Sequence, residues 1–222
     1  MKVVILGSTG MVGKGVLLEC LEDSRIEKVL LINRQSCQVS NEKITEVLHS
    51  DFLNMSNLSA SLAGFDACFF CMGITSAGMD EKGYSKITYE LTRQFAEIFI
   101  RANPDSIFCY VSGAGTDSSE KGRIMWARVK GKTENTILAM PFKKAFMFRP
   151  GYIHPMKGVK SKTGWYNMFY VVLKPLYFLL KPAKAYVTDS ATLGKAMINT
   201  AINGYDKNII ESVDINILGR SK

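Results

Sequence analysis

The chain has 222 residues, of which 47% are hydrophobic and 22% are charged. These fractions are typical of a folded globular protein and exclude a disordered or fibrous chain. The N-terminal stretch MKVVILGSTG has a short apolar run and no small-residue cleavage pattern, so we predict a buried strand there and no signal peptide. Five cysteines, an odd number, favour reduced thiols and a cytoplasmic location. We predict a single domain over residues 1–222, with residues 152–188 as a small substrate or flap lobe.

The net charge of +8 is concentrated in one part of the chain. Residues 1–120 carry 10 basic and 15 acidic side chains, whereas residues 121–184 carry 14 basic side chains and one acidic side chain. Such a basic block fits an anionic cofactor, an acidic membrane surface or nucleic acid, and lysines that are merely solvated are an equal alternative. Because no recognised nucleic-acid-binding motif accompanies the block, we do not expect nucleic acid as a partner.

Short apolar runs alternate with helical patterns along the chain. The expected strands are residues 2–6, 28–33, 43–49, 66–71, 106–111 and 144–149, of which 43–49 has the weakest pattern. Most of these runs are apolar on both faces, as in parallel strands buried between layers of helices. Helical spacing predicts helices over 11–23, 82–104 and 190–203, and residues 212–218 resemble a late strand. In the second helix, Ile87, Leu91, Phe95 and Ile98 should share the buried face. The alternation predicts an α/β, Rossmann-like, doubly wound parallel sheet with helices on both faces.

Cys68 and Cys71 form a C-x-x-C pattern that lies in an expected strand. Residues three apart on a strand face opposite sides, so these two sulfurs cannot share a metal ion or close a disulfide. Only two histidines, His49 and His154, exist to complete a site. We therefore predict buried structural thiols and no metal site.

A glycine-rich loop joins the first expected strand to the first expected helix. Its glycines, Gly7, Gly10 and Gly13, give the spacing G-x-x-G-x-x-G in GSTGMVG. A glycine loop in this context makes a tight turn, brings the backbone close to a pyrophosphate and aims helix N-terminal amides at the anion. The predicted dinucleotide-binding residues of the loop are Gly7, Ser8, Thr9, Gly10, Met11, Val12 and Gly13.

The end of the second strand indicates which dinucleotide is preferred. In NAD-preferring sites an acidic residue there accepts hydrogen bonds from the ribose 2′-hydroxyl. This chain has Asn33 and Arg34 instead, and a guanidinium binds a 2′-phosphate with charge-assisted hydrogen bonds. Ser8, Thr9 and Ser36 offer further hydroxyl donors. We predict NADP as the cofactor, with NAD as the alternative.

With these residues the chain resembles the atypical short-chain dehydrogenases/reductases, in particular small NAD(P)-binding epimerase/dehydratase-like proteins related to the Tat-interacting oxidoreductase. The resemblance rests on GSTGMVG at 7–13, DF at 51–52, CFFCMGIT at 68–75, YVSGAG at 110–115 and FRPGYIHP at 148–155. The resemblance implies the following placements. Asp51 and Phe52 flank the adenine, and Cys71, Met72 and Gly73 pass under the adenine ribose. Ser112 is the active-site serine, and Pro150, Gly151 and Tyr152 lie against the nicotinamide.

The same family places Tyr-x-x-x-Lys on the helix after the fifth strand, where this chain reads WARVK, residues 126–130. Lys130 is present and is expected to hold the nicotinamide ribose. Trp126 replaces the tyrosine, and an indole does not titrate in a useful range, so we expect it to form a pocket wall. The proton for catalysis would come from Tyr152, or from water held by Ser112 and Lys130. Two further matches, at 170–174 and 177–181, follow the sixth strand and are interpreted as coincidences.

Residues 164–182 are aromatic and apolar, and Lys174-Pro175 interrupts them before they reach the length of a membrane-spanning helix. A substrate-covering flap, a homodimer face and a peripheral membrane contact all fit this segment.

Two functional hypotheses follow. The first is an NADP-binding oxidoreductase or epimerase/dehydratase-like enzyme acting on a small carbonyl or hydroxyl substrate. The second is a non-catalytic NADP-binding sensor or scaffold that docks a protein partner or an anionic membrane surface.

Overall fold

Seven parallel strands form the centre of the protein, in the order β3-β2-β1-β4-β5-β6-β9. We describe residues 1–52, 54–159 and 187–220 of a computed structural model. The strands are β1 (Lys2–Leu6), β2 (Lys28–Asn33), β3 (Ile44–Leu48), β4 (Ala67–Phe70), β5 (Ile107–Val111), β6 (Lys144–Arg149) and β9 (Ile209–Glu211). All six strands expected up to residue 149 are confirmed, including the weakest, which is the edge strand β3. The strand order reverses between β1 and β4, which creates a crevice at the carboxyl ends of these strands.

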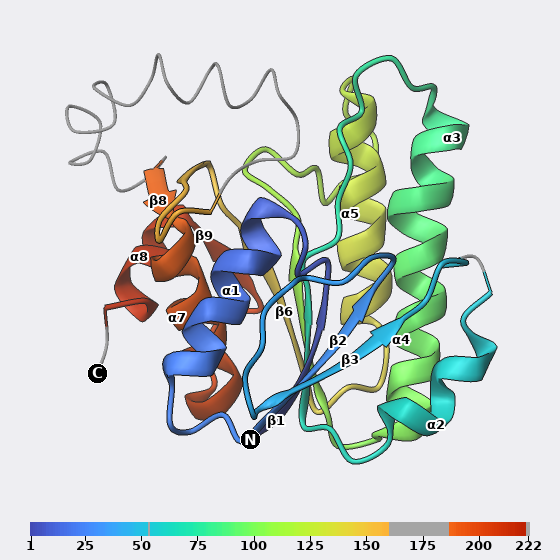
Figure 1. The fold of residues 1–222 in the computed structure, drawn as a ribbon. Coiled ribbons are helices and arrows are strands. Elements are labelled where there is room, and N and C mark those ends of the chain that lie inside the picture. The colour runs from blue at the N-terminus through green and yellow to red at the C-terminus, as the bar shows by residue number, and fades with distance from the viewer. Residues whose placement is uncertain (53, 160–186, 221–222) are drawn as a thin grey trace.

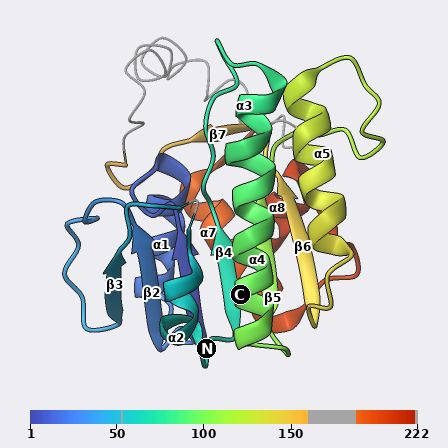
Figure 2. The same cartoon turned by 90° about the vertical axis from the view of Figure 1, so that its right-hand side faces the viewer.

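Helices cover both faces of this sheet (Figures 1 and 2). On one face lie α1 (Met11–Glu22), α7 (Ser190–Asn203) and α8 (Ser212–Leu218), and on the other lie α2 (Ser59–Leu62), α3 (Glu81–Ser85), α4 (Leu91–Ala102) and α5 (Met125–Leu138). A short 3-10 turn, η1 (Ser56–Leu58), precedes α2. Alternate residues of β1 divide between two apolar cores, with Val3 and Ile5 in one and Val4 and Leu6 in the other. The predicted doubly wound α/β fold is therefore confirmed.

The helical segment before β5 is interrupted by a π-helical turn, η2 (Lys86–Glu90), between α3 and α4. The Leu91 N–H bonds the Lys86 carbonyl across five residues, which shifts the helical register by one residue. Leu91 and Phe95 are buried and Ile98 is partly buried, as predicted. Ile87 is 39% exposed, so its predicted place on the buried face is wrong. The extra residue in the π turn accounts for this error, since it breaks the 3.6-residue spacing on which the prediction relied.

The late strand predicted at 212–218 is wrong, because these residues form α8 and only the preceding Ile209–Glu211 form a strand, β9. The Glu211 and Asp214 side chains make a reciprocal capping box that starts the helix. The helix buries Ile215 and exposes Val213 and Ile217. Alternate apolar residues had suggested a strand, but the polar capping groups determine the local structure.

The two cysteines of the C-x-x-C pattern contact opposite faces of the sheet, as predicted. Cys68 belongs to the core under α4, and Cys71 packs against the core under α1 and α7. All five cysteines are free thiols. Within the described part of the chain, no helix has both the length and the apolar character needed to span a membrane.

A two-stranded parallel sheet lies beside the carboxyl edge of the main sheet and pairs β7 (Tyr152–His154) with β8 (Val187–Asp189). The Asp189 carboxylate accepts the Thr192 N–H at 2.7 Å and so caps α7. Most of the predicted lobe 152–188 lies outside the described residues, including the aromatic segment 164–182 and the Tyr-x-x-x-Lys matches at 170–174 and 177–181.

Helices α1 and α7 approach closely at small residues. A Cβ added at Gly194 would lie 2.8 Å from Glu19 Cγ and 3.2 Å from Val16 Cα. The Val16 Cα belongs to a helix backbone, so it cannot move away as the end of a flexible side chain can. The absence of a side chain at Gly194 therefore sets the distance between these two helices.

We expect Gly194→Ala to lower the free energy of unfolding by about 1–3 kcal/mol, because overpacking of this contact outweighs the higher helix propensity of alanine. Urea unfolding followed by circular dichroism measures the change. Lys195→Ala, at a neighbouring side chain that is 58% exposed, is the control and should stay within about 0.5 kcal/mol of wild type. An equal or higher urea midpoint for Gly194→Ala would contradict close packing at this position.

Candidate functional site

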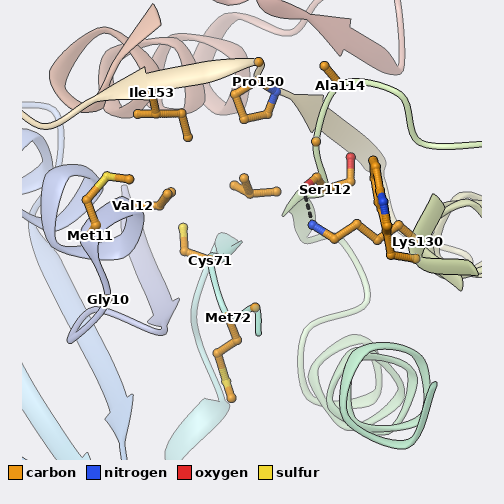
Figure 3. A pocket seen from close by; sticks show the side chains of 15 residues that line it. Gly10, Met11, Val12, Cys71, Met72, Ser112, Ala114, Lys130, Pro150 and Ile153 are labelled. Atoms are coloured by element: carbon orange, nitrogen blue, oxygen red, sulfur yellow. Dashed lines mark hydrogen bonds between the residues drawn. The ribbon is translucent and has the colours of Figure 1, made fainter. Parts of the chain in front are cut away.

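A cavity of about 450 Å³ opens at the carboxyl edge of the sheet, beside the reversal of strand order between β1 and β4 (Figure 3). Its walls come from the segments that follow β1, β4, β5 and β6 and from helix α5. The lining residues are Gly10, Met11, Val12, Cys71, Met72, Gly73, Val111, Ser112, Gly113, Ala114, Trp126, Lys130, Pro150, Gly151 and Ile153. Crevices at this position of a doubly wound sheet are where ligands bind.

The glycine loop forms one wall of the cavity, and its glycines are required by close backbone approaches. Gly7 has a φ of +83°, and a Cβ there would lie 2.9 Å from the Cys71 carbonyl group. A Cβ at Gly13 would lie 2.3 Å from the Gly7 oxygen. Gly10 is the N-cap of α1 and provides no side chain to cap the amides of the first turn. The loop therefore has the tight turn and the open helix N-terminus that an anion needs.

Ten of the predicted site residues line this cavity, namely Gly10, Met11, Val12, Cys71, Met72, Gly73, Ser112, Lys130, Pro150 and Gly151. Trp126 also lines it, and its role as a wall of the substrate pocket stays a prediction. The remaining predicted residues do not line it: Gly7, Ser8, Thr9, Gly13, Arg34, Asp51, Phe52 and Tyr152. The cavity thus brings together residues expected at the pyrophosphate, the adenine ribose and the nicotinamide.

Two of the residues outside the cavity have side chains that are engaged elsewhere. The Ser8 hydroxyl is buried and pairs with the side-chain amide of Asn33 at 2.8–3.0 Å. Phe52 is buried in the core and contacts the His49 ring edge to face, with ring centroids 5.6 Å apart. On β7 it is Ile153, the residue after Tyr152, that faces the cavity. A proton-transfer role for Tyr152 stays a prediction.

A buried ionic network lies directly behind Ser112. The Ser112 hydroxyl donates to a carboxylate oxygen of Glu134, and Glu134 is fully buried. The Arg149 Nε donates to both oxygens of the same carboxylate, at 3.0 and 3.2 Å. Arg149 also contacts Ser118 Oγ at 2.5 Å and Glu211 Oε1 at 3.5 Å. The Ser112 hydroxyl also lies 3.2 Å from the Phe148 carbonyl oxygen, so both of its contacts are structural ones, to α5 and to β6.

Lys130 brings an amino group to the cavity wall, where its Nζ donates a hydrogen bond to the Ser112 carbonyl oxygen (Figure 3). Burial lowers the pKa of Lys130 to about 8, although nearby Glu134 raises it. Cys71 is the other titratable side chain among the described lining residues, and burial raises the pKa of its thiol to about 12. Lys130 is therefore the described lining group that exchanges a proton near neutral pH.

Sequence reasoning missed Glu134, although a signal for it exists. Glu134 is the one acidic residue of the basic block 121–184, and it lies four residues after Lys130 and eight after Trp126. On α5 this spacing places the three side chains along one helix face. The sequence cannot identify Arg149 as the partner, because that contact joins α5 to β6.

Glu46 is a second residue that sequence reasoning missed, and it lies beside the end of β2. Its carboxylate accepts a hydrogen bond from Asn33 Nδ2 at 2.8 Å, so an acidic group does stand next to the position where the sequence places Asn33 and Arg34. Glu46 belongs to β3, the strand that pairs with β2, and not to the end of β2 itself. Arg34 is exposed.

We expect Glu134→Gln to lower the free energy of unfolding by about 3–5 kcal/mol, because the substitution leaves the buried Arg149 guanidinium without its main counter-charge. Urea denaturation measures this loss. Glu90→Gln, at an exposed acid before α4, should change the stability by less than about 0.5 kcal/mol. A loss below about 1 kcal/mol for Glu134→Gln would show that Ser118 and Glu211 suffice to hold Arg149.

Comparison with models of known protein families gives no match. Protein HTATIP2 from Rattus norvegicus is 26% identical over 204 residues, which cover 90% of this chain and 81% of that protein. Protein fmp52, mitochondrial, from Emericella nidulans is 25% identical over 213 residues, 91% of this chain and 89% of that protein. UDP-glucuronic acid 4-epimerase from Bacillus cereus, solved in complex with NAD, has the same fold, with a TM-score of 0.64, 15% identity and coverage of 95% of this chain and 77% of that one. This chain is thus similar to HTATIP2 over 90% of its length and shares its fold with solved structures that include short-chain dehydrogenases/reductases, as its motifs predict.

Proposed function

We propose that the protein is an NAD(P)-dependent oxidoreductase or epimerase/dehydratase-like enzyme that acts on a small carbonyl or hydroxyl substrate. The observation that carries this proposal is the convergence of the glycine loop and Lys130 on one cavity at the switch point of the sheet. The epimerase from Bacillus cereus, which has this fold, was solved with NAD.

The described residues fit a dinucleotide. Side chains at Gly7 and Gly13 would collide with backbone atoms, which leaves a bare backbone loop beside the N-terminus of α1. No side chain caps that terminus, and its first turn contains no acidic residue, so the amides there suit a pyrophosphate. Gly10, Met11 and Val12 would hold the pyrophosphate end, and Pro150 and Gly151 would lie against the nicotinamide.

A bound nicotinamide supplies hydride transfer, and the protein must then supply or accept a proton at the substrate oxygen. Trp126 cannot do this, and the Ser112 hydroxyl proton is directed at Glu134. In the reducing direction, protonated Lys130 gives a proton from Nζ to the substrate oxygen. In the oxidising direction, the neutral amine accepts that proton from the substrate hydroxyl. The Glu134 carboxylate from α5 acts electrostatically on this amine, and that carboxylate is itself paired with Arg149 from β6.

NADP is the dinucleotide that Arg34 favours, because its exposed guanidinium at the end of β2 would be available to a 2′-phosphate. The cytoplasmic location and a homodimer stay predictions.

We expect purified, cofactor-stripped protein to bind both nicotinamide dinucleotides, with energy transfer from Trp126 to the reduced nicotinamide. Fluorescence titration with NADPH and NADH measures the affinities. Trp126→Phe should remove the energy transfer and leave the dissociation constants within about twofold, because the indole forms a wall and makes no hydrogen bond to the pyrophosphate end. Binding of neither dinucleotide would contradict both the enzyme and the dinucleotide-binding sensor or scaffold, because both require a bound dinucleotide.

The pH dependence follows from the lowered pKa of Lys130, which is about 8. Below that pH the amine is protonated, so the reducing direction should proceed at low pH and slow as the pH rises through 8. The oxidising direction should show the opposite dependence. Lys130→Met should lower the turnover by about 10²–10⁴-fold in both directions and abolish this titration.

A measurement on the cofactor-free protein checks the same group. The rate at which a water-soluble amine-reactive ester labels Lys130, followed by peptide mass spectrometry, should rise with a midpoint near pH 8. Lys195, whose side chain is 58% exposed, is labelled in the same samples as the control. A midpoint for Lys130 at or above that of Lys195 would exclude Lys130 as the proton-transfer group.

A further inference from the structure

The Glu46 carboxylate accepts three hydrogen bonds around the end of β2. Asn33 Nδ2 donates to Glu46 Oε1 at 2.8 Å, the Cys37 N–H donates to the same oxygen at 2.9 Å, and the Ser36 hydroxyl donates to Oε2 at 2.7 Å. The carboxylate thereby fixes the start of the loop that follows β2. Ser36, which the sequence predicts as a hydrogen-bond donor to a 2′-phosphate, donates its hydrogen bond to Glu46 instead.

This carboxylate is negatively charged at neutral pH. Partial burial raises the pKa of Glu46, but the hydrogen bonds from the Cys37 amide, Ser36 and Asn33 outweigh burial and bring the pKa below its usual value. The three donors are all neutral, so they stabilise the charge without cancelling it. A full negative charge therefore remains at the end of β2.

The position of Glu46 relative to the glycine loop is fixed by two further contacts. Asn33 uses its Nδ2 for Glu46 and Ser8, while its Oδ1 accepts from the Ser8 hydroxyl at 3.0 Å. Ser8 belongs to the loop predicted to hold the pyrophosphate, and both Ser8 and Asn33 are buried. Glu46 is thus one side chain removed from the loop, next to the place where an acid of dinucleotide-binding folds reads the adenine ribose.

We propose that Glu46 determines cofactor specificity by disfavouring the 2′-phosphate of NADP and thereby opposing Arg34. The inference rests on the proposed function, since it requires a dinucleotide bound at the carboxyl edge of the sheet. A 2′-phosphate would place like charges close to the Glu46 carboxylate, whereas the 2′-hydroxyl of NAD adds no charge. Cofactor preference then depends on the balance between the attraction of exposed Arg34 and the repulsion of Glu46.

The test compares the dissociation constants for NADPH and NADH in Glu46→Gln, measured by fluorescence titration at low salt. Glutamine has nearly the same shape and lacks the charge. The affinity for NADPH relative to NADH should rise about tenfold, and the rise should shrink at 0.5 M salt because of screening. An unchanged ratio would overturn the proposal.

Two variants separate charge from loop support. Glu46→Asp keeps the charge on a shorter side chain, so the affinity for NADPH relative to NADH should stay near that of wild type. A ratio equal to that of Glu46→Gln would overturn the proposal, because it would show that Glu46 acts by supporting the loop. Glu42→Gln removes an exposed acid four residues earlier and should not change the ratio. A comparable rise in Glu42→Gln would likewise overturn it, by showing a diffuse charge effect.

Tight NADH binding by wild type with an unchanged ratio in Glu46→Gln would refute this inference alone, whereas binding of neither nucleotide would refute the proposed function too.

Discussion

The buried Glu134 carboxylate is the contact on which the geometry of the cavity depends. It accepts hydrogen bonds from the Ser112 hydroxyl at the end of β5 and from the Arg149 guanidinium at the end of β6, so one side chain of α5 joins two strand ends. A buried charge pair of this kind is costly to desolvate and is tolerated because nearly every polar group finds a partner. Its rigidity keeps Lys130, one helical turn earlier, directed at the Ser112 carbonyl.

This arrangement changes what the site can do. In a site with a tyrosine four residues before the lysine, the lysine lowers the pKa of the tyrosine, and the serine hydroxyl is free to contact a substrate. Here Trp126 gives the cavity an apolar wall, and Ser112 is directed inward. Burial then lowers the pKa of Lys130 to about 8, within the range where a general acid or base works best at physiological pH. Trp126 therefore stands where a titrating tyrosine is expected, and the nearby Lys130 provides a group that titrates in the useful range.

The sequence predicts the sheet well because its signals are local. Six apolar runs, the glycine loop and the chain order suffice for a doubly wound fold, and the parallel connections leave few alternatives. It fails where local signals compete. Residues 212–218 alternate like a strand, yet the capping box of Glu211 and Asp214 starts a helix there. Ile87 follows the helical spacing, yet the π turn at Lys86–Glu90 rotates it outward.

The site divides in the same way between local and long-range information. The cavity contains Gly10, Ser112 and Lys130, because each belongs to a sequence motif, the first two at the ends of β1 and β5 and the third on α5. Glu46 and Glu134 escape prediction because each acts across elements, Glu46 from β3 to the end of β2 and Glu134 from α5 to β5 and β6. Both acids adjoin the expected ends of a bound dinucleotide. A motif therefore predicts where a ligand binds, whereas the proposed cofactor preference and proton transfer depend on charges that neighbouring elements contribute.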